Sequence, residues 1–346
     1  MRILCIGPLW RGSNAGGLFK AFSRKGCLID IVDEFYHMSM NGQDTAAKAL
    51  YKLIRPFQAK QYNKDIIDRI NIFKPQIFFV FKGTFVFAET LAYAKKMGCK
   101  LALFYPDVSM TAHGAYLSKA IPQYDIIFTT KSFGEKDLQA QFGISKSYFV
   151  PHGFDPEIHR KINIAEEERN IFSCDTSFIG TWSPKKEMYL STLVEKLPGI
   201  NLKIWGTQWE KASNKQLTQA LQNQPIFGDM YAMAIQCSKI NLGILSEQVR
   251  GASSGDLITS RTFHITGAGG FLLHEQNEES VLYYQEGVEA AFFADAGEMA
   301  DKVAYYLAND DLRVSIADNG YKKANLLYSL DNRAEYILDI IKKERC

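Results

Sequence analysis

Residues 256 to 273 carry the side chains best suited to binding chemistry. Asp256 and His264 are eight positions apart, and Arg261 lies between them. Thr259 and Ser260 are residue types that begin helices, so a short helix is predicted from here to a glycine cluster, followed by an apolar strand. Arg261 and His264 would share one face of this helix, where a guanidinium fork and the positive helix end can hold a phosphate.

Each of these three side chains also has a structural alternative. Arg261 can be a surface residue paired with Asp256, His264 can be a packed core histidine, and Asp256 can shape the turn before the helix. Near a helix N-terminus the positive end of the dipole favours the neutral form of His264. A neutral imidazole still accepts one hydrogen bond and donates another.

Two further residues are candidates for proton transfer. Asp107 follows a buried apolar run at 101–105, and His113 comes six positions later. A carboxylate or an imidazole in such a place can remove the proton of an acceptor hydroxyl. Capping of a loop is the structural alternative for both residues.

The elements that must position these residues alternate between short apolar runs and helix-periodic stretches. This pattern is typical of β-α units around parallel sheets, which bind ligands at the carboxyl ends of their strands. In the polar loop 10–17, Gly16 and Gly17 would let backbone amides approach a phosphate or an acceptor. Strands are predicted at 3–6, 28–32, 77–81, 101–105, 126–129, 148–150, 176–179, 202–205, 240–244 and 270–273.

The alternation stops once, and this interruption divides the chain. Residues 151–170 contain Pro-His-Gly-Phe-Asp-Pro-Glu and a charged run, so we predict a linker between one domain at 1–150 and another at 171–330. The last segment, 331–346, has apolar residues at helical spacing. A chain of 346 residues is long enough for two domains with separate cores.

The composition is that of a folded protein, with 47% hydrophobic and 23% charged residues. The net charge of +2 provides no global attraction to nucleic acid, so nucleic acid is not an expected partner and any anion site must be local. The six cysteines have no metal or disulfide spacing, which is typical of reduced thiols. With no signal peptide and no membrane span apparent, we predict a cytoplasmic protein.

One basic stretch suggests that the cytoplasmic protein contacts a membrane surface. Residues 48–64 interleave five basic residues with leucine, isoleucine, tyrosine and phenylalanine. Such a helix can rest on an anionic membrane surface, which would place the protein peripherally at the inner face of the membrane. The alternative is a basic amphipathic helix that packs on the core.

Several motifs occur in an order typical of one family. Pro-His-Gly-Phe-Asp-Pro-Glu at 151–157 resembles the element that ends the first domain of group 1 glycosyltransferases. Phe-Ile-Gly-Thr-Trp-Ser-Pro-Lys-Lys at 178–186 resembles the first strand and the phosphate loop of their donor domain. The segments at 204–206 and 227–231 are similar to the next strand and to the base-binding loop.

The segment 256–273 resembles the donor-sugar and ribose site of the same family. There, an acid is followed by seven residues and a second acid; here Asp256 is the first acid and His264 occupies the second position. The residues that follow have the order seen in the spore-maturation (CgeB-like) branch. They are Gly287, Phe293, Tyr305, Tyr306, Leu307 and Arg313.

This resemblance implies an α/β protein of the GT-B fold, with two Rossmann-like domains facing a central cleft and a final helix that crosses back to the first domain. It implies transfer of a sugar from a nucleoside-diphosphate sugar to an acceptor that is a glycan, a lipid-linked molecule or a protein. Asp107 and His113 are the candidate catalytic residues. The candidate donor-binding residues are Arg261, His264, Asp256, Thr181, Lys185, Lys186, Gly206, Tyr231, Gly16 and Gly17.

The expected chemistry needs no cofactor other than the nucleotide sugar. The sequence contains no Asp-x-Asp motif, so we predict no metal and assign stabilisation of the leaving diphosphate to basic side chains and helix N-termini. For Lys185 and Lys186, a solvated surface pair is the alternative. A non-catalytic protein that binds a nucleotide or glycan as a scaffold is the second hypothesis, motivated by His264. An epimerase is the third, although no Gly-x-Gly-x-x-Gly follows any predicted strand.

Overall fold

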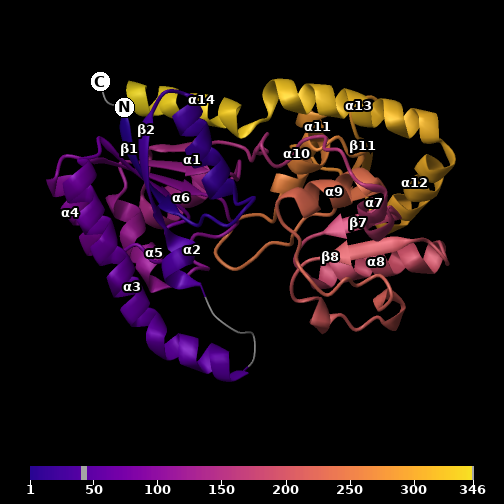
Figure 1. Cartoon of the computed structure of the whole chain (residues 1–346), viewed down its shortest axis with the longest axis horizontal. Helices are drawn as coiled ribbons and strands as arrows, with labels where there is room; N and C mark the ends of the chain where they lie inside the picture. Colours follow the sequence, from indigo (N-terminus) through magenta and orange to yellow (C-terminus); the bar gives the residue numbers. More distant parts are fainter. Residues whose placement is uncertain (40–44, 345–346) are drawn as a thin grey trace. The chain divides into compact units, whose positions relative to one another are not determined.

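The computed structural model describes residues 1–39 and 45–344, and these residues form two compact units (Figure 1). The first unit contains Met1–Pro151, Gln248–Ser254 and the chain from Asp331 onward. The second contains His152–Glu247 and Gly255–Leu330. Each unit is a parallel sheet with its own helices, so the predicted α/β class with two sheets is confirmed.

The sheet of the first unit has the strand order β2-β1-β3-β4-β5-β6, and each pair of neighbouring strands is parallel. Its central strands are continuous apolar runs because helices cover both faces of a parallel sheet. In β1, for example, every residue from Ile3 to Ile6 is fully buried. The strands are β1 (Arg2–Gly7), β2 (Leu28–Asp33), β3 (Ile77–Phe81), β4 (Lys100–Tyr105), β5 (Ile126–Thr129) and β6 (Ser147–Phe149).

The helices of the first unit follow the strands in turn. They are α1 (Asn14–Arg24), α2 (Glu34–Met38), α3 (Thr45–Phe73), α4 (Ala88–Lys96), α5 (Ala115–Ala120), the 3-10 turn η1 (Ile121–Gln123), α6 (Gly134–Phe142) and α14 (Leu330–Lys343). The final helix α14 belongs to this unit, as the GT-B fold predicts. Two ion pairs fix it to the end of α1 and to the residue that follows: Arg24 to Asp331 at 2.7 Å and Lys25 to Glu335 at 2.5 Å.

The sheet of the second unit has the order β11-β10-β9-β7-β8. Counted from the first strand of each unit, the first five strands of both sheets have the order 2-1-3-4-5, and the sheet of the first unit adds a sixth strand at its end. Its strands are β7 (Cys174–Ile179), β8 (Leu202–Trp205), β9 (Ser238–Gly243), β10 (Leu272–Glu275) and β11 (Ala291–Phe293). The three-residue strand β11 was not among the predicted strands.

The helices of the second unit include the one that carries Arg261 and His264. They are α7 (Glu166–Phe172), α8 (Pro184–Lys196), the 3-10 turns η2 (Trp209–Lys211) and η3 (Lys215–Leu217), α9 (Asp229–Cys237), α10 (Ser260–Gly267), α11 (Ser280–Tyr283), α12 (Ala296–Ala308) and α13 (Asp310–Leu327). Helix α10 begins after Thr259 and ends at Gly267, close to its predicted bounds.

The segment 151–170 is not a spacer, and the predicted linker is wrong in this respect. From His152 onward it belongs to the second unit. Phe154 is fully buried, and a Cβ atom added at Gly267 would lie 2.6 Å from its ring. The charged run forms the first turn of α7, where acidic residues stabilise a helix N-terminus. The polar composition of this segment therefore gave no sign of the buried Phe154 or of the start of α7.

Helix α3 is the longest helix of the described residues, and it continues through Pro56. Its second half packs on the sheet through Ala59, Tyr62, Ile66 and Ile70, all fully buried. Figure 1 shows its first half extending beyond the strands of this unit. Within the described part of the chain, no helix is both long enough and apolar enough to span a membrane.

Candidate functional site

The second unit brings two loops and one helix together at the point where its strand order reverses. Strands β7 and β9 are neighbours, and the chain after β7 leads to β8 on one side while the chain after β9 leads to β10 on the other. In open parallel sheets, ligands bind beyond the carboxyl ends of the two strands that flank such a reversal. We therefore take the loops after Ile179 and Gly243 as the frame of the candidate site.

Arg261, on α10, spans this frame. Its Nη2 donates to the Ile244 carbonyl at 2.7 Å, its Nη1 lies 3.5 Å from the Ile179 carbonyl, and its guanidinium lies 5.1 Å from the centre of the Phe178 ring. Its Nε atom is buried and has no hydrogen-bond partner among the described residues. Burial lowers the pKa of Arg261, although a guanidinium remains charged. One donor of a charged group is thus left for a ligand.

The alternative of a surface arginine paired with Asp256 does not fit this geometry. Across the residues that the structure describes, Arg261 makes no ion pair within 4 Å, and its partners are backbone carbonyls. The Asp256 carboxylate acts on it only through its electrostatic field. Asp256 itself donates its backbone N–H to the Ser246 carbonyl at 3.0 Å, which fixes it beside the loop after β9.

Lys186 is the second cation at this point. It lies in the first turn of α8, after the N-cap Ser183 and Pro184, and it is buried. Its Nζ donates to the Thr181 carbonyl at 3.1 Å and to Ser246 Oγ at 3.0 Å. Burial, with a smaller contribution from the nearby Arg261 charge, lowers its pKa to about 8. A bound anion would stabilise the charged form, because Lys186 has no ion pair with any described residue.

Lys185 differs from its neighbour in having an acidic partner. Its Nζ lies 2.6 Å from Glu275 Oε1, and its backbone N–H donates to Glu247 Oε1 at 2.9 Å. The alternative of a solvated surface pair therefore fits neither residue. One lysine is buried without an acidic partner and the other is neutralised, so Lys186 is the better phosphate ligand.

Thr181 and Gly206 lie on the loops after β7 and β8. Thr181 is exposed, and its Oγ1 lies 3.1 Å from Thr207 Oγ1. Gly206 has φ +145°, and a Cβ atom added there would lie 2.0 Å from the Gly180 carbonyl oxygen. This close backbone approach requires glycine at 206 and sets the spacing between the two loops.

His264 lies in a stack of aromatic side chains rather than at a helix start. Its ring is stacked on His159 with centroids 3.8 Å apart, and Tyr231 of α9 meets it edge-on at 5.7 Å. Its pKa is lowered well below the usual value, first by burial and then by the neighbouring His159. The predicted cause, the helix N-terminus, is wrong, because His264 is the fifth of the eight residues of α10.

One nitrogen of His264 is available to a ligand. The imidazole has a backbone hydrogen bond to Gly153, and its Nε2 is buried without a hydrogen-bond partner among the described residues. In a neutral imidazole whose other nitrogen donates, this atom is an acceptor. His159 does not compete for the role, since its Nδ1 accepts from the Asp155 N–H at 3.1 Å. Tyr231 is partly buried and adds a phenol whose pKa is raised by burial to about 12.

The first unit holds Asp107 and His113 next to each other after β4. Asp107 Oδ2 lies 2.9 Å from His113 Nε2 and 2.8 Å from Lys82 Nζ. Burial alone would raise the pKa of Asp107, but the hydrogen bond from His113 and the Lys82 charge hold it well below its usual range. Asp107 is therefore a weak base, and its geometry suits an orienting partner of His113.

Sequence reasoning missed Lys82 and Glu34, which also follow strands of this sheet. Lys82 has φ +68°, a strained conformation for a residue other than glycine, and it directs its Nζ to Asp107. Glu34 follows β2, and its Oε2 is buried without a partner among the described residues. Burial raises its pKa to about 7. Neither residue belongs to a recognisable motif. Only their positions directly after β3 and β2 could have indicated a role at the site.

Gly16 and Gly17 do not present free amides, which corrects the expectation for the first loop. Helix α1 already begins at Asn14, inside the predicted loop 10–17. The Gly16 N–H donates to Ser13 Oγ and the Gly17 N–H to the Ser13 carbonyl, both at 3.0 Å. A serine N-cap thus satisfies the two donors that were expected to meet a ligand.

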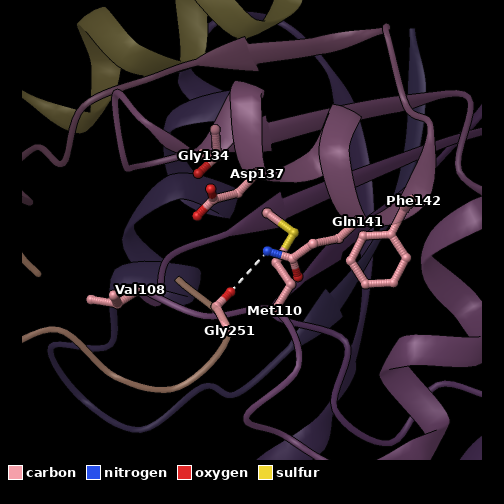
Figure 2. Close-up of a pocket in the computed structure, with 8 residues that line it drawn as sticks. Val108, Met110, Gly134, Asp137, Gln141, Phe142 and Gly251 are labelled. Atoms are coloured by element: carbon pink, nitrogen blue, oxygen red, sulfur yellow. Dashed lines mark hydrogen bonds between the residues drawn. The ribbon is translucent and has the colours of Figure 1, made fainter. Parts of the chain in front are cut away.

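The loop between β9 and α10 contributes residues 248–254 to the first unit, although its flanks belong to the second. Ser109 Oγ donates to the Arg250 carbonyl at 2.8 Å, and the Ser253 N–H donates to Asp137 Oδ2 at 3.0 Å. Figure 2 shows the third bond, from Gln141 Nε2 to the Gly251 carbonyl at 2.9 Å. The cavity here measures about 10 Å³, enough for a single water at most.

Comparison with known proteins agrees with this architecture. Residues 185–339 match a family described as glycosyl transferase-like. No curated protein matches the sequence. The match begins at Lys185 and includes α10, so it covers most of the candidate site of the second unit.

Solved structures with the GT-B fold are similar to the whole chain. Anabaena Alr3699/HepE, solved with UDP and glucose, has 11% identity and a TM-score of 0.64, over 99% of this chain and 100% of that one. Sucrose-phosphate synthase from Thermosynechococcus elongatus has 8% identity and a TM-score of 0.66, over 99% and 98%. The chain therefore has the GT-B fold with its two parallel sheets.

The fold by itself does not select one reaction. A putative UDP-N-acetylglucosamine 2-epimerase from Listeria monocytogenes is also similar, with 11% identity and a TM-score of 0.55, over 99% of this chain and 95% of that one. Function must be argued from the site.

Proposed function

We propose that this protein is a glycosyltransferase that moves a sugar from a nucleoside-diphosphate sugar to a hydroxyl-bearing acceptor, with the donor bound by the second unit. One observation carries the proposal. Arg261 and Lys186 both lie beyond the carboxyl ends of β7 and β9, and neither has an acidic partner within 4 Å among the described residues. Two desolvated cations at a switch point suit a diphosphate.

The rest of the donor would extend over α10 and the adjoining loops. His264 Nε2 would accept a hydrogen bond from a ribose hydroxyl, and Asp256 would accept bonds from hydroxyls of the transferred sugar. Thr181 and the backbone near Gly206 would border the phosphates, and Tyr231 would lie toward the base. These roles follow the resemblance to group 1 glycosyltransferases. The UDP complexes of the structural neighbour HepE support a uridine nucleotide as the first donor to test.

For acceptor activation we propose His113, oriented by Asp107. In an inverting course, the acceptor O–H proton passes to His113 Nδ1 while the acceptor oxygen forms a bond to the anomeric carbon. The bond from that carbon to the diphosphate oxygen breaks, and the nucleoside diphosphate leaves with the electron pair. Asp107 holds Nε2–H at 2.9 Å and thereby leaves Nδ1 as the basic atom.

In this proposal, side chains supply the charge that stabilises the leaving diphosphate. Arg261 and Lys186 act at the point where negative charge develops, which is the kind of electrostatic stabilisation that contributes most to catalysis. Activity is accordingly expected to persist in the presence of a chelator such as EDTA. Loss of activity in EDTA, restored by a divalent cation, would assign the diphosphate to a metal instead.

A non-catalytic nucleotide-binding scaffold is the second candidate, and the stack of His264 on His159 favours it. A histidine held at 3.8 Å by a second ring has a structural role as well as a binding one. Turnover separates the two candidates. Release of nucleoside diphosphate from a nucleotide sugar that binds indicates an enzyme, and binding without release in an acceptor panel indicates a scaffold.

The donor site can be tested by calorimetric titration of the full chain with uridine, guanosine, adenosine, cytidine and thymidine diphosphates. Arg261→Ala and Lys186→Met should each weaken the best ligand by roughly 10- to 100-fold, because a charge-assisted phosphate contact contributes about 1.5–3 kcal/mol. Lys322→Met removes an exposed lysine of α13 in the same unit and should leave affinity unchanged. If neither site variant weakens binding, the donor site is elsewhere.

A further inference from the structure

The first half of α3 exposes a continuous apolar stripe. Leu50, Leu53, Ile54 and Phe57 stand three and four positions apart, so they share one helix face. Leu53 is 72% exposed and Phe57 is 73% exposed. This finding contradicts the alternative that the stretch packs on the core, which holds only from Ala59 onward. Lys48 lies in the same stretch, but its side chain is outside the described residues.

The charges around this stripe are all of one sign. Between residues 45 and 64 the sequence has five basic residues and no acidic one. Lys60 and Lys64 continue the line of the stripe at the spacing of Phe57, and both are exposed. Lys52 and Arg55 lie on the opposite side of the same turns. Among the described residues, none of these four side chains forms an ion pair.

We propose that the first half of α3 binds an anionic membrane surface, with the apolar stripe inserted at the level of the headgroups. An apolar face opposed by lysine and arginine is the arrangement of helices that lie in the membrane interface. Lys60 and Lys64, at the end of the stripe, would meet anionic headgroups. The proposal does not depend on the glycosyl transfer proposed above.

The same charges argue against a second copy of the chain as the occupant. A two-fold symmetric contact through this stripe would bring two identical basic stretches together, with no acidic residue between 45 and 64 to neutralise them. An anionic bilayer offers both an apolar layer for Leu53 and Phe57 and the opposite charge for the lysines. Charge complementarity therefore favours an anionic membrane over a second copy of the chain as the partner of this stripe.

The test is co-sedimentation of the full chain with phosphatidylcholine vesicles, with and without phosphatidylglycerol. Binding is expected only to the anionic vesicles and should weaken as salt increases. Leu53→Glu and Phe57→Glu should each weaken binding at least about tenfold. Lys60→Gln and Lys64→Gln should each weaken it about fivefold. Ile72→Glu is the matched control, since Ile72 is 76% exposed near the other end of the same helix, 15 positions beyond Phe57.

Two controls keep the outcome decisive. Circular dichroism and nucleotide titration should show that each variant remains folded, with unchanged donor affinity. The proposal is overturned if the unsubstituted chain does not bind anionic vesicles, or if Ile72→Glu weakens binding as much as Phe57→Glu. It is also overturned if sedimentation velocity shows a dimer that Leu53→Glu dissociates while vesicle binding is unchanged.

Discussion

At the scale of single residues, Lys186 is an ammonium group whose pKa is lowered by its burial. Burial holds that pKa at about 8, close to physiological pH. Free lysines titrate near pH 10, so the folded protein favours the neutral form of this side chain much more than water does. Such a group gains most from a ligand that carries the opposite charge.

This pKa predicts how donor binding depends on pH. Between pH 6 and 7 Lys186 is protonated, and affinity for a nucleoside diphosphate should be nearly constant. As pH rises above about 8 the ammonium loses its proton, and affinity should fall by up to about tenfold per pH unit. Calorimetry from pH 6.5 to 9.5 measures this profile. Lys186→Met should bind more weakly and show a flatter profile, whereas Lys322→Met should keep the original shape.

The residue types of this site were predictable in part. Arg261 follows from its position near the start of a predicted helix, and Lys186 from its place after a strand and a Gly-Thr-Trp loop. The sequence could not show that Glu275 neutralises Lys185, because the two residues are 90 positions apart. It likewise could not show the stack of His264 on His159, which depends on the packing of residues taken to be a linker.

At the scale of elements, the strands were the most predictable part of the chain. Strands β3, β5 and β8 have their predicted bounds, and the other predicted strands differ by up to two residues at either end. Buried parallel strands are short apolar runs, which a linear sequence displays directly. Two features were missed because each depends on a single residue. Helix α1 begins inside the predicted loop because Ser13 caps it, and Phe154 is buried in a segment predicted to be a linker.

One element-level prediction concerns the loops that frame the donor site. Gly206→Ala adds a Cβ atom 2.0 Å from the Gly180 carbonyl oxygen, on a backbone with φ +145°. The loops after β7 and β8 must then separate, so we expect a loss of roughly 2–4 kcal/mol in unfolding free energy and weaker nucleotide binding. Urea unfolding and calorimetry measure the two effects.

Gly199→Ala provides the comparison. Gly199 also has a positive φ of +89°, but a Cβ atom there would meet nothing within 4 Å. Its substitution should cost only the conformational strain, about 1 kcal/mol, and should leave nucleotide affinity unchanged. Equal losses for the two variants would mean that the approach of Gly180 to Gly206 has no particular importance.

At the scale of the whole molecule, the chain passes repeatedly between its two units. Residues 248–254 leave the second unit for the first and return before Asp256, and α14 ends the chain in the first unit. The sequence analysis predicted the return of the last helix but not that of the loop. Polar residues such as Ser253 show no periodicity, and their three hydrogen bonds to Ser109, Asp137 and Gln141 are visible only in the fold.

The stability of the whole chain should depend on pH through Glu34 in the first unit. Its folded pKa of about 7 lies above the usual glutamate value of 4.5, so the folded state binds more protons than the unfolded state between these pH values. The contribution of Glu34 to the free energy of unfolding is therefore present in full below about pH 4.5 and is lost as pH rises through 7. Glu34→Gln removes the ionisable group, so it should stabilise the protein at pH 8 by roughly 1–3 kcal/mol and change little near pH 4.5.

Thermal unfolding of both proteins at pH 4.5, 6 and 8 measures this difference, which corresponds to a few degrees in Tm at pH 8. Glu195→Gln, at an exposed position of α8, is the control and should have no pH-dependent effect. If Glu34→Gln lowers Tm at pH 8, the Glu34 carboxylate must be stabilised there by a positive charge, for which Lys82 is the nearest candidate on the adjoining loops. Lys82→Met would then reverse the effect, because it removes the charge that acts on both Glu34 and Asp107.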